Sequence, residues 1–245
     1  MYRTLRWIDR CIAGGLDPEL RDICVKGLVD RNLPGYAVGG LAGRDDKDSF
    51  WRVIAQCIAA LPEDKPRYVM GVGYPLDTVV CSALGADMYD YVYPIRTTRF
   101  GTALIPEGVL KLKHRAMADD TRPIDPTCPC MVCKNYTRTY IHCLVTKDAV
   151  GSQLLSYHNL YYMMRLSRNL HTSMVEGKFP KFVCDFLQTM FPKGDVLEWV
   201  CNAMEVAEID ISSCCAPFPS CQEKYSSDEI RTNDIHMELR LTHKL

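Results

Sequence analysis

The chain has 245 residues, 47% of them hydrophobic, and a formal net charge of −1. A chain of this length can bury the core of one large domain, or of a domain with an appended subdomain. The near-neutral charge excludes a globally basic surface, so any contact with RNA must come from local patches.

The cysteines and the N-terminal residues bear on cellular location. The 13 cysteines are odd in number and scattered, and Met1 is followed by Tyr-Arg-Thr-Leu-Arg rather than by an apolar signal region. Both features favour a reducing compartment. No apolar run approaches the length of about 18 residues that a membrane span needs, so we expect no transmembrane segment.

The first part of the chain alternates helix and strand patterns. Residues 17–31 have helical spacing of apolar side chains at 20, 23, 24/25 and 27/28, with Asp17 as N-cap and Pro18 in the first turn. Strands are expected at 36–42, 68–72 and 88–93, and further helices at 46–61 and 75–85. A period of about 25–30 residues indicates βα units around a parallel sheet, with functional loops at the C-terminal ends of the strands. Three strands are too few to close an eight-stranded barrel.

After residue 105 the pattern changes. A β-prone piece at 110–115 precedes a cysteine cluster, and helices are expected at about 135–148, 151–173 and 179–191. Cys128, Cys130 and Cys133 lie within six residues, and His158 follows 25 residues later. Three thiolates and one imidazole complete a tetrahedral zinc shell, so we predict a structural zinc site.

Other residues compete for roles in metal binding. His142 and Cys143 are alternatives for the fourth zinc ligand, although His142 on an amphipathic helix is better explained by packing or capping. Cys214, Cys215 and Cys221 form a weaker candidate for a second cluster, because their surroundings are rich in proline and hold no nearby partner set.

Asp90 lies in the otherwise apolar strand predicted at 88–93. A lone buried carboxylate costs several kcal/mol unless it is hydrogen-bonded or shifts its pKa, so Asp90 is either a structural cap or a catalytic residue. Asp87 is expected on the opposite face of the strand, which excludes a working pair of these two carboxylates.

Glycines and basic residues lie near the expected strand ends. Gly39, Gly40, Gly71 and Gly73 would let a ligand approach the backbone, although turn formation alone also explains them. The local basic residues are Arg96, Arg99, Lys111, Lys113, His114 and Arg115. They are either solvated surface charges or contacts for phosphate.

These patterns divide the chain into four expected parts. We expect a partial βα barrel with the Asp90 strand at 1–105, a zinc-binding subdomain at 106–158, helices that pack back on the barrel at 159–212, and a disordered tail at 213–245.

The segments 39–43, 67–73, 87–90 and 93–101, together with the zinc ligands, resemble the tRNA-guanine transglycosylase family in order and spacing over residues 1–212. The eukaryotic catalytic subunits are the most similar branch. The resemblance implies an α/β fold that is the C-terminal part of a (β/α)8 TIM-type barrel with an inserted zinc subdomain.

The resemblance also implies roles for individual residues. Asp90 would be the nucleophile that attacks the ribose C1′ of guanosine 34 in tRNA, after which queuine replaces guanine. Gly39, Gly40 and Met70 would contact the base, and Gly43 would leave room for the cyclopentenediol of queuine. RNA contacts are implied for Gly71, Val72, Gly73, Tyr74, Pro75, Leu76 and Asp77 and for Ile95, Arg96, Thr97, Thr98 and Arg99. Zn²⁺ would be bound by Cys128, Cys130, Cys133 and His158.

The implied partners are tRNAs with a GUN anticodon (those for Asp, Asn, His and Tyr), the base queuine and a homologous accessory subunit. The implied location is the cytoplasm, including peripheral association with the mitochondrial outer membrane.

The chain also departs from the family pattern. The family's proton acceptor and its base-reading aspartate belong to an N-terminal half of the barrel that this sequence lacks. Ala13 stands where a base-binding glutamine is expected, so a strand is expected to have been skipped there, and Tyr91 and Ile95 replace the usual cysteine and threonine. We therefore expect a shortened form that is inactive in base exchange on its own. The alternative is a non-catalytic zinc-binding fragment or accessory-type subunit.

Overall fold

The computed structural model describes residues 11–12, 14–41, 46–147 and 149–215. The expectations that concern Ala13, Gly43, Cys221 and the tail beyond 215 lie outside the described residues.

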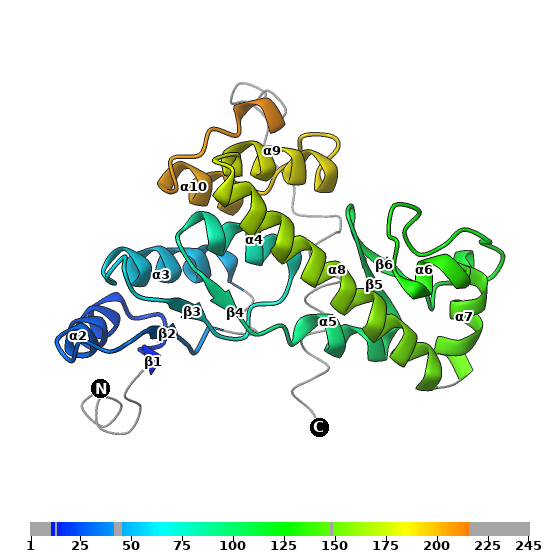
Figure 1. Ribbon diagram of the computed structural model, residues 1–245, viewed down its shortest axis with the longest axis horizontal. Coiled ribbons are helices and arrows are strands. Elements are labelled where there is room, and N and C mark those ends of the chain that lie inside the picture. The colour runs from blue at the N-terminus through cyan, green and yellow to red at the C-terminus, as the bar shows by residue number, and fades with distance from the viewer. Residues whose placement is uncertain (1–10, 13, 42–45, 148, 216–245) are drawn as a thin grey trace, which may run out of the picture.

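Four short parallel strands form one sheet in the order β1-β2-β3-β4. They are β1 (Cys11–Ile12), β2 (Tyr36–Val38), β3 (Arg67–Val69) and β4 (Met88–Tyr89), and the helices between them are α2 (Pro18–Val29), α3 (Lys47–Ala59) and α4 (Pro75–Ala83). In the register, Val38 of β2 lies between Ile12 of β1 and Val69 of β3. The expected βα units and parallel sheet are confirmed (Figure 1). Among the described residues the sheet is open rather than closed into a barrel.

The strands differ in number and length from the prediction. Cys11–Ile12 form an additional short strand that pairs with β2, directly before the position where a strand is expected to have been skipped. The strands β2 and β3 end early, because Gly40 and Gly71 adopt left-handed backbone conformations with φ of +77° and +76°, which do not continue a strand. The last strand, β4, also ends early, since Tyr93 already begins the short helix α5 (Tyr93–Arg96).

Helix α2 begins as predicted but turns a different face to the core. The Asp17 side chain accepts a hydrogen bond from the Leu20 amide, as expected of an N-cap. The buried face carries Arg21, Cys24, Val25 and Leu28, whereas Leu20 and Ile23 are 39% and 49% exposed. The buried face thus includes the charged residue Arg21. Leu20 and Ile23, which the apolar spacing had predicted to be buried, are exposed instead.

A second unit follows the sheet. It contains the antiparallel hairpin of β5 (Thr102–Ile105) and β6 (Gly108–Lys111), the helices α6 (Met131–Asn135) and α7 (Arg138–Lys147), and the first half of α8 (Ala149–Val175). The 3-10 turns η1 (Thr97–Phe100) and η2 (Arg115–Met117) flank the hairpin. Its own core includes Ala103, Leu112, Ile124, Ile141 and Leu155, packed around the cysteines. The expected limits at 105 and 158 fall at the hairpin turn and within α8.

The 27-residue helix α8 crosses the molecule diagonally and joins the second unit to the sheet (Figure 1). Its Leu155 belongs to the core of the second unit, and its Met163, Leu166 and Leu170 belong to the core of the sheet unit. The helices α9 (Phe179–Met190) and α10 (Glu198–Val206) pack at the far end of α8 in the same core as the sheet.

The described chain ends with a short ordered turn. Ser212–Cys214 form the 3-10 turn η3, and the buried Cys214 thiol donates to the Cys184 carbonyl at 3.6 Å. Order therefore extends past residue 213, where the tail was expected to begin. Among the described residues no helix combines the length and apolar character needed to cross a bilayer.

Candidate metal centre and substrate-binding edge

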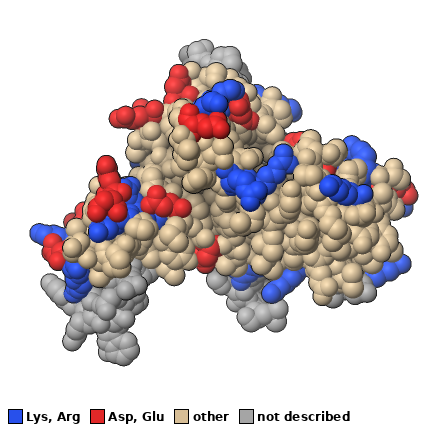
Figure 2. Space-filling model, in the orientation of Figure 1, with Lys and Arg blue, Asp and Glu red and all other residues tan. Residues whose placement is uncertain are grey.

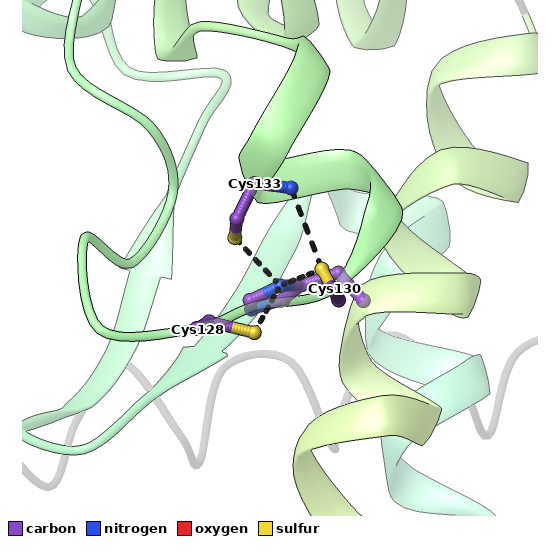
Figure 3. A group of neighbouring side chains, drawn as sticks. Cys128, Cys130 and Cys133 are labelled. Atoms are coloured by element: carbon purple, nitrogen blue, oxygen red, sulfur yellow. Dashed lines mark hydrogen bonds between the residues drawn. The ribbon is translucent and has the colours of Figure 1, made fainter.

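Cys128, Cys130, Cys133 and His158 converge in the second unit. The imidazole Nδ1 of His158 lies 4.0 Å from the Cys128 sulfur, 3.5 Å from that of Cys130 and 3.3 Å from that of Cys133. The three interactions meet at one nitrogen (Figure 3). Local structure explains the convergence, since Cys128 closes a turn that begins at Asp125, Cys130 caps α6, and Cys133 lies in the first turn of that helix.

The four ligand atoms fit a tetrahedral metal ion. Bond lengths of about 2.3 Å to sulfur and about 2.0–2.1 Å to nitrogen place each sulfur about 3.6 Å from the nitrogen in a tetrahedral zinc site. The distances of 3.3–4.0 Å in this chain bracket that value. All four ligand atoms lie within 4.8 Å of one another, which makes them the group among the described residues that could hold a metal.

The surroundings of His158 favour the ligand role. Its Nε2 lies 2.8 Å from the carbonyl oxygen of Leu104, to which it donates, so Nδ1 faces the sulfurs. Burial opposes a charge on the imidazole, but hydrogen bonds to the three sulfurs outweigh it and raise the pKa of His158 to about 12, so a metal that binds at Nδ1 would displace a proton. Burial also opposes ionisation of Cys130, yet hydrogen bonds from His158 and the Cys133 amide lower the pKa of that thiol to about 6. Cys130 thus favours the thiolate, the form that binds metal, whereas burial raises the pKa of the Cys133 thiol.

The alternative candidates for metal ligands lie outside this cluster. His142 Nδ1 bonds to the carbonyl oxygen of Leu112 at 2.7 Å, which is the packing role expected for it, and Cys143 is an exposed thiol on α7. Cys214 is a free thiol that bonds to the backbone of Cys184, and it belongs to no metal-binding group among the described residues.

The carboxyl ends of the parallel strands bring the other predicted site residues to one edge of the sheet. Gly39 and Gly40 follow β2, Met70 and Gly71 follow β3, and Asp90 follows β4. The Asp90 Oδ1 accepts a hydrogen bond of 2.5 Å from the Gly71 amide. Met70 is 37% exposed, and Gly40 is also exposed. Backbone, an apolar side chain and a carboxylate therefore share this edge.

Asp90 does not lie in a buried strand, as the sequence had suggested. It is exposed just beyond β4, because the strand ends at Tyr89. Asp87, also exposed, accepts from the Arg67 amide through Oδ2 at 2.8 Å, so the two carboxylates form no pair, as expected. The next residue, Tyr91, anchors this segment to α8 through a 2.7 Å hydrogen bond to Ser167.

The sequence-based reasoning missed Arg21, which lies fully buried behind the edge. Its guanidinium donates to the carbonyl oxygens of Ile12 (2.9 Å), Gly15 (3.0 and 2.8 Å) and Gly39 (2.9 Å). It therefore ties α2 to the ends of β1 and β2. The signal that could have identified it is its spacing from Cys24, Val25 and Leu28 on one helical face.

Most of the first segment expected to contact RNA is buried. The inward-facing residues are Val72, Gly73, Pro75, Leu76 and Asp77. A side chain at Gly73 would meet Tyr93 and Pro94 at 3.1–3.2 Å, so that glycine allows the chain to pass close to α5. Asp77 is paired with Lys47 at 2.6 Å. These five residues therefore lie in the interior of the protein. Gly71 and Tyr74 are only partly exposed.

The second expected RNA segment has two faces. Thr97 and Thr98 are only 3% and 2% exposed, so their side chains pack against the protein. Ile95, Arg96 and Arg99 are exposed. Lys113, His114 and Arg115 are exposed nearby in sequence, and the Lys113 ammonium donates to the Arg99 carbonyl at 3.3 Å. Most acidic groups on the face in Figure 2 lie over the sheet unit and the α9–α10 end, away from the second unit.

Comparisons with known proteins agree with this geometry. A family model described as queuine tRNA-ribosyltransferase matches residues 1–192. The queuine tRNA-ribosyltransferase catalytic subunit of Schizosaccharomyces pombe is 40% identical over 86% of this chain and 58% of its own length, and that of Caenorhabditis elegans is 46% identical over 76% and 50%. The queuine tRNA-ribosyltransferase of Thermus thermophilus is 38% identical over 83% and 57%. The chain spans about half the length of the curated relatives it matches.

Proposed function

The chain belongs to the queuine tRNA-ribosyltransferase family, and from this premise we propose that it acts in the exchange of guanine 34 of tRNA for queuine, with Asp90 as the nucleophile. The observation that carries the proposal is the position of the Asp90 carboxylate. It is exposed at the carboxyl edge of the sheet and hydrogen-bonded to the Gly71 amide, beside Met70.

The proposed reaction has two displacements at the ribose C1′. A carboxylate oxygen of Asp90 forms a bond to C1′ while the bond from C1′ to the purine nitrogen breaks, and the purine leaves with that electron pair and takes up a proton. The nitrogen of queuine then attacks C1′ and gives up its proton to solvent, and the ester bond breaks to restore the carboxylate. Covalent catalysis of this type divides one difficult substitution into two easier ones, as in retaining glycosidases.

The hydrogen bond between Asp90 and Gly71 supports this role. It fixes the orientation of Oδ1, and within the described part of the chain Oδ2 bonds to no other group. One oxygen is therefore held by the protein while the other can face a ribose. We propose that the backbone at Gly39 and Gly40 and the side chain of Met70 contact the base, with Gly43 completing this surface.

We propose that Ile95, Arg96 and Arg99 contact the RNA. They lie on the exposed face of α5 and η1, and arginine suits phosphate recognition because its planar fork can bind two oxygens. The proposed substrates are tRNAs with a GUN anticodon. We further propose a homologous accessory subunit as partner and the cytoplasm as location, including the mitochondrial outer membrane.

The proposed metal is zinc, held by Cys128, Cys130, Cys133 and His158. A site with three thiolates and one imidazole has no open position, so the ion would stabilise the second unit rather than take part in the reaction. The matching sulfur–nitrogen distances and the buried hydrogen bond of His158 to Leu104 support this assignment.

The test is incorporation of labelled guanine or queuine into tRNA, by the full chain with and without a homologous accessory subunit. We expect incorporation in at least one of these conditions and its loss in Asp90→Asn, which keeps the shape of the side chain but removes the nucleophile. Asp87→Asn is the matched control at the other end of β4 and should retain activity, since an amide oxygen can still accept from the Arg67 amide.

Two outcomes would contradict the proposal. Incorporation that survives Asp90→Asn would exclude Asp90 as the nucleophile. Binding of tRNA with no incorporation in any condition would favour the alternative, a non-catalytic zinc-binding subunit.

A further inference from the structure

Asn159 is fully buried in the middle of α8 and contacts three separate backbone groups. Its Oδ1 accepts from the Leu104 amide at 2.8 Å, and its Nδ2 donates to the carbonyl oxygens of Pro94 (2.9 Å) and Thr102 (3.1 Å). Both amide hydrogens and the carbonyl oxygen are thus engaged, which is nearly the full capacity of an asparagine side chain. A single side chain therefore ties α8 to β5 and to the start of α5.

The residue before Asn159 is the proposed metal ligand His158. Its Nε2 donates to the Leu104 carbonyl oxygen at 2.8 Å, while Asn159 accepts from the amide of the same residue. His158 and Asn159, which are consecutive in α8, thus hydrogen-bond to the carbonyl oxygen and to the amide of Leu104. The metal centre and the Asn159 contacts share one fixed point on β5.

The contact with Pro94 extends this fixed point to the surface. Pro94 is buried in α5, and one turn later the Thr98 hydroxyl lies 3.1 Å from the hydroxyl of Ser156, also on α8. The opposite face carries the exposed Arg96 and Arg99. The direction in which the two guanidinium groups point depends on how α5 and η1 are seated on α8.

We propose that Asn159 is a positioning residue that fixes α5 and η1, and with them Arg96 and Arg99, relative to the metal centre for contact with RNA phosphates. The identity of the ligand as RNA rests on the proposed function. The coupling between the metal centre and α5 rests on the hydrogen bonds of His158 and Asn159 alone.

The Asn159→Asp variant should keep one of these hydrogen bonds and remove the other two, with little change in the shape of the side chain. A carboxylate can still accept from the Leu104 amide, but its second oxygen would face the carbonyl oxygens of Pro94 and Thr102, where only a donor fits. Asn169→Asp is the matched control, because Asn169 is exposed on the same helix.

The experiment measures zinc content, tRNA affinity and amide hydrogen exchange in the full chain, using a tRNA with guanosine at position 34. We expect Asn159→Asp to retain its zinc, to bind this tRNA about tenfold more weakly, as the misplacement of one or two phosphate contacts would cause, and to exchange faster over residues 95–104. Asn169→Asp should match the wild type. Unchanged affinity and exchange in Asn159→Asp would overturn the proposal.

A second measurement uses the wild-type chain and needs neither tRNA nor a folded variant. When a chelator removes the metal, amides of α5 and η1 should lose protection together with those of β5. Retained protection of α5 and η1 after β5 has lost its own would contradict the coupling. A wild-type chain that binds no tRNA would contradict the proposed function, whereas the exchange data would still decide the role of Asn159.

Discussion

The buried guanidinium of Arg21 donates a hydrogen bond of 2.9 Å to the carbonyl oxygen of Gly39, immediately before the proposed base-contacting Gly40. No cis peptide bond occurs among the described residues, so the amide of Gly40 points away from the carbonyl that Arg21 holds. By fixing this peptide plane from behind, Arg21 sets the orientation of the backbone at the proposed substrate-binding edge.

Replacement of Arg21 should therefore be costly. Arg21→Met would leave the buried carbonyl oxygen of Gly39 without its donor, while the carbonyl of Ile12 would keep the Gly39 amide and that of the exposed Gly15 could turn to water. An unsatisfied buried group costs about 1–3 kcal/mol, so we expect the free energy of unfolding, measured with urea, to fall by about that amount. Arg168→Met, at an exposed position on α8, should change it by less than about 0.5 kcal/mol. An equal loss of unfolding free energy in both variants would show that the buried hydrogen bonds of Arg21 stabilise the fold no more than an exposed arginine does.

Metal analysis tests the cysteine cluster. We expect about one zinc per chain, because the four ligands form a closed tetrahedral set. Cys130→Ser should lose most of this zinc and unfold the second unit, since structural zinc contributes folding energy directly. Cys143→Ser is the matched control and should keep metal and fold, because Cys143 is an exposed thiol outside the cluster. If Cys130→Ser retained zinc and a cooperative melting transition, the ligand assignment would be wrong.

Residues close in sequence, or with a strong spacing signal, could be predicted well. The cysteine spacing predicted three members of the group that could hold a metal, and the βα alternation predicted the parallel sheet. Arg21 and Asn159 could not be found this way, because their role depends on carbonyl groups that only the folded chain brings together. The exposure of Asp90 was missed for a related reason. The apolar pattern continues to residue 93, whereas hydrogen bonding in β4 stops at Tyr89.

The two threonines of η1, Thr97 and Thr98, should respond differently to the same substitution by valine. The Thr98 hydroxyl donates to the Ile95 carbonyl at 2.7 Å and contacts Ser156, whereas the buried Thr97 hydroxyl has no partner among the described residues. We expect Thr98→Val to reduce the free energy of unfolding by about 1 kcal/mol and Thr97→Val to leave it unchanged or raise it slightly, because an apolar group of the same shape replaces an unsatisfied one. Thermal unfolding measures both. A larger loss for Thr97→Val than for Thr98→Val would contradict these hydrogen-bond assignments.

Salt dependence can distinguish phosphate contacts from structural arginines. Each phosphate contact contributes about 0.7–0.9 to the slope of log affinity against log salt concentration. If Arg96 and Arg99 each bind one phosphate, Arg96→Gln and Arg99→Gln should each reduce the slope for tRNA by about that amount, and the double variant by about twice as much. Arg52→Gln is the control, because Arg52 pairs with Asp48 on α3 in the sheet unit. Slopes that stay unchanged in the Arg96 and Arg99 variants would place the RNA elsewhere, since a guanidinium that neutralises a phosphate must release counterions.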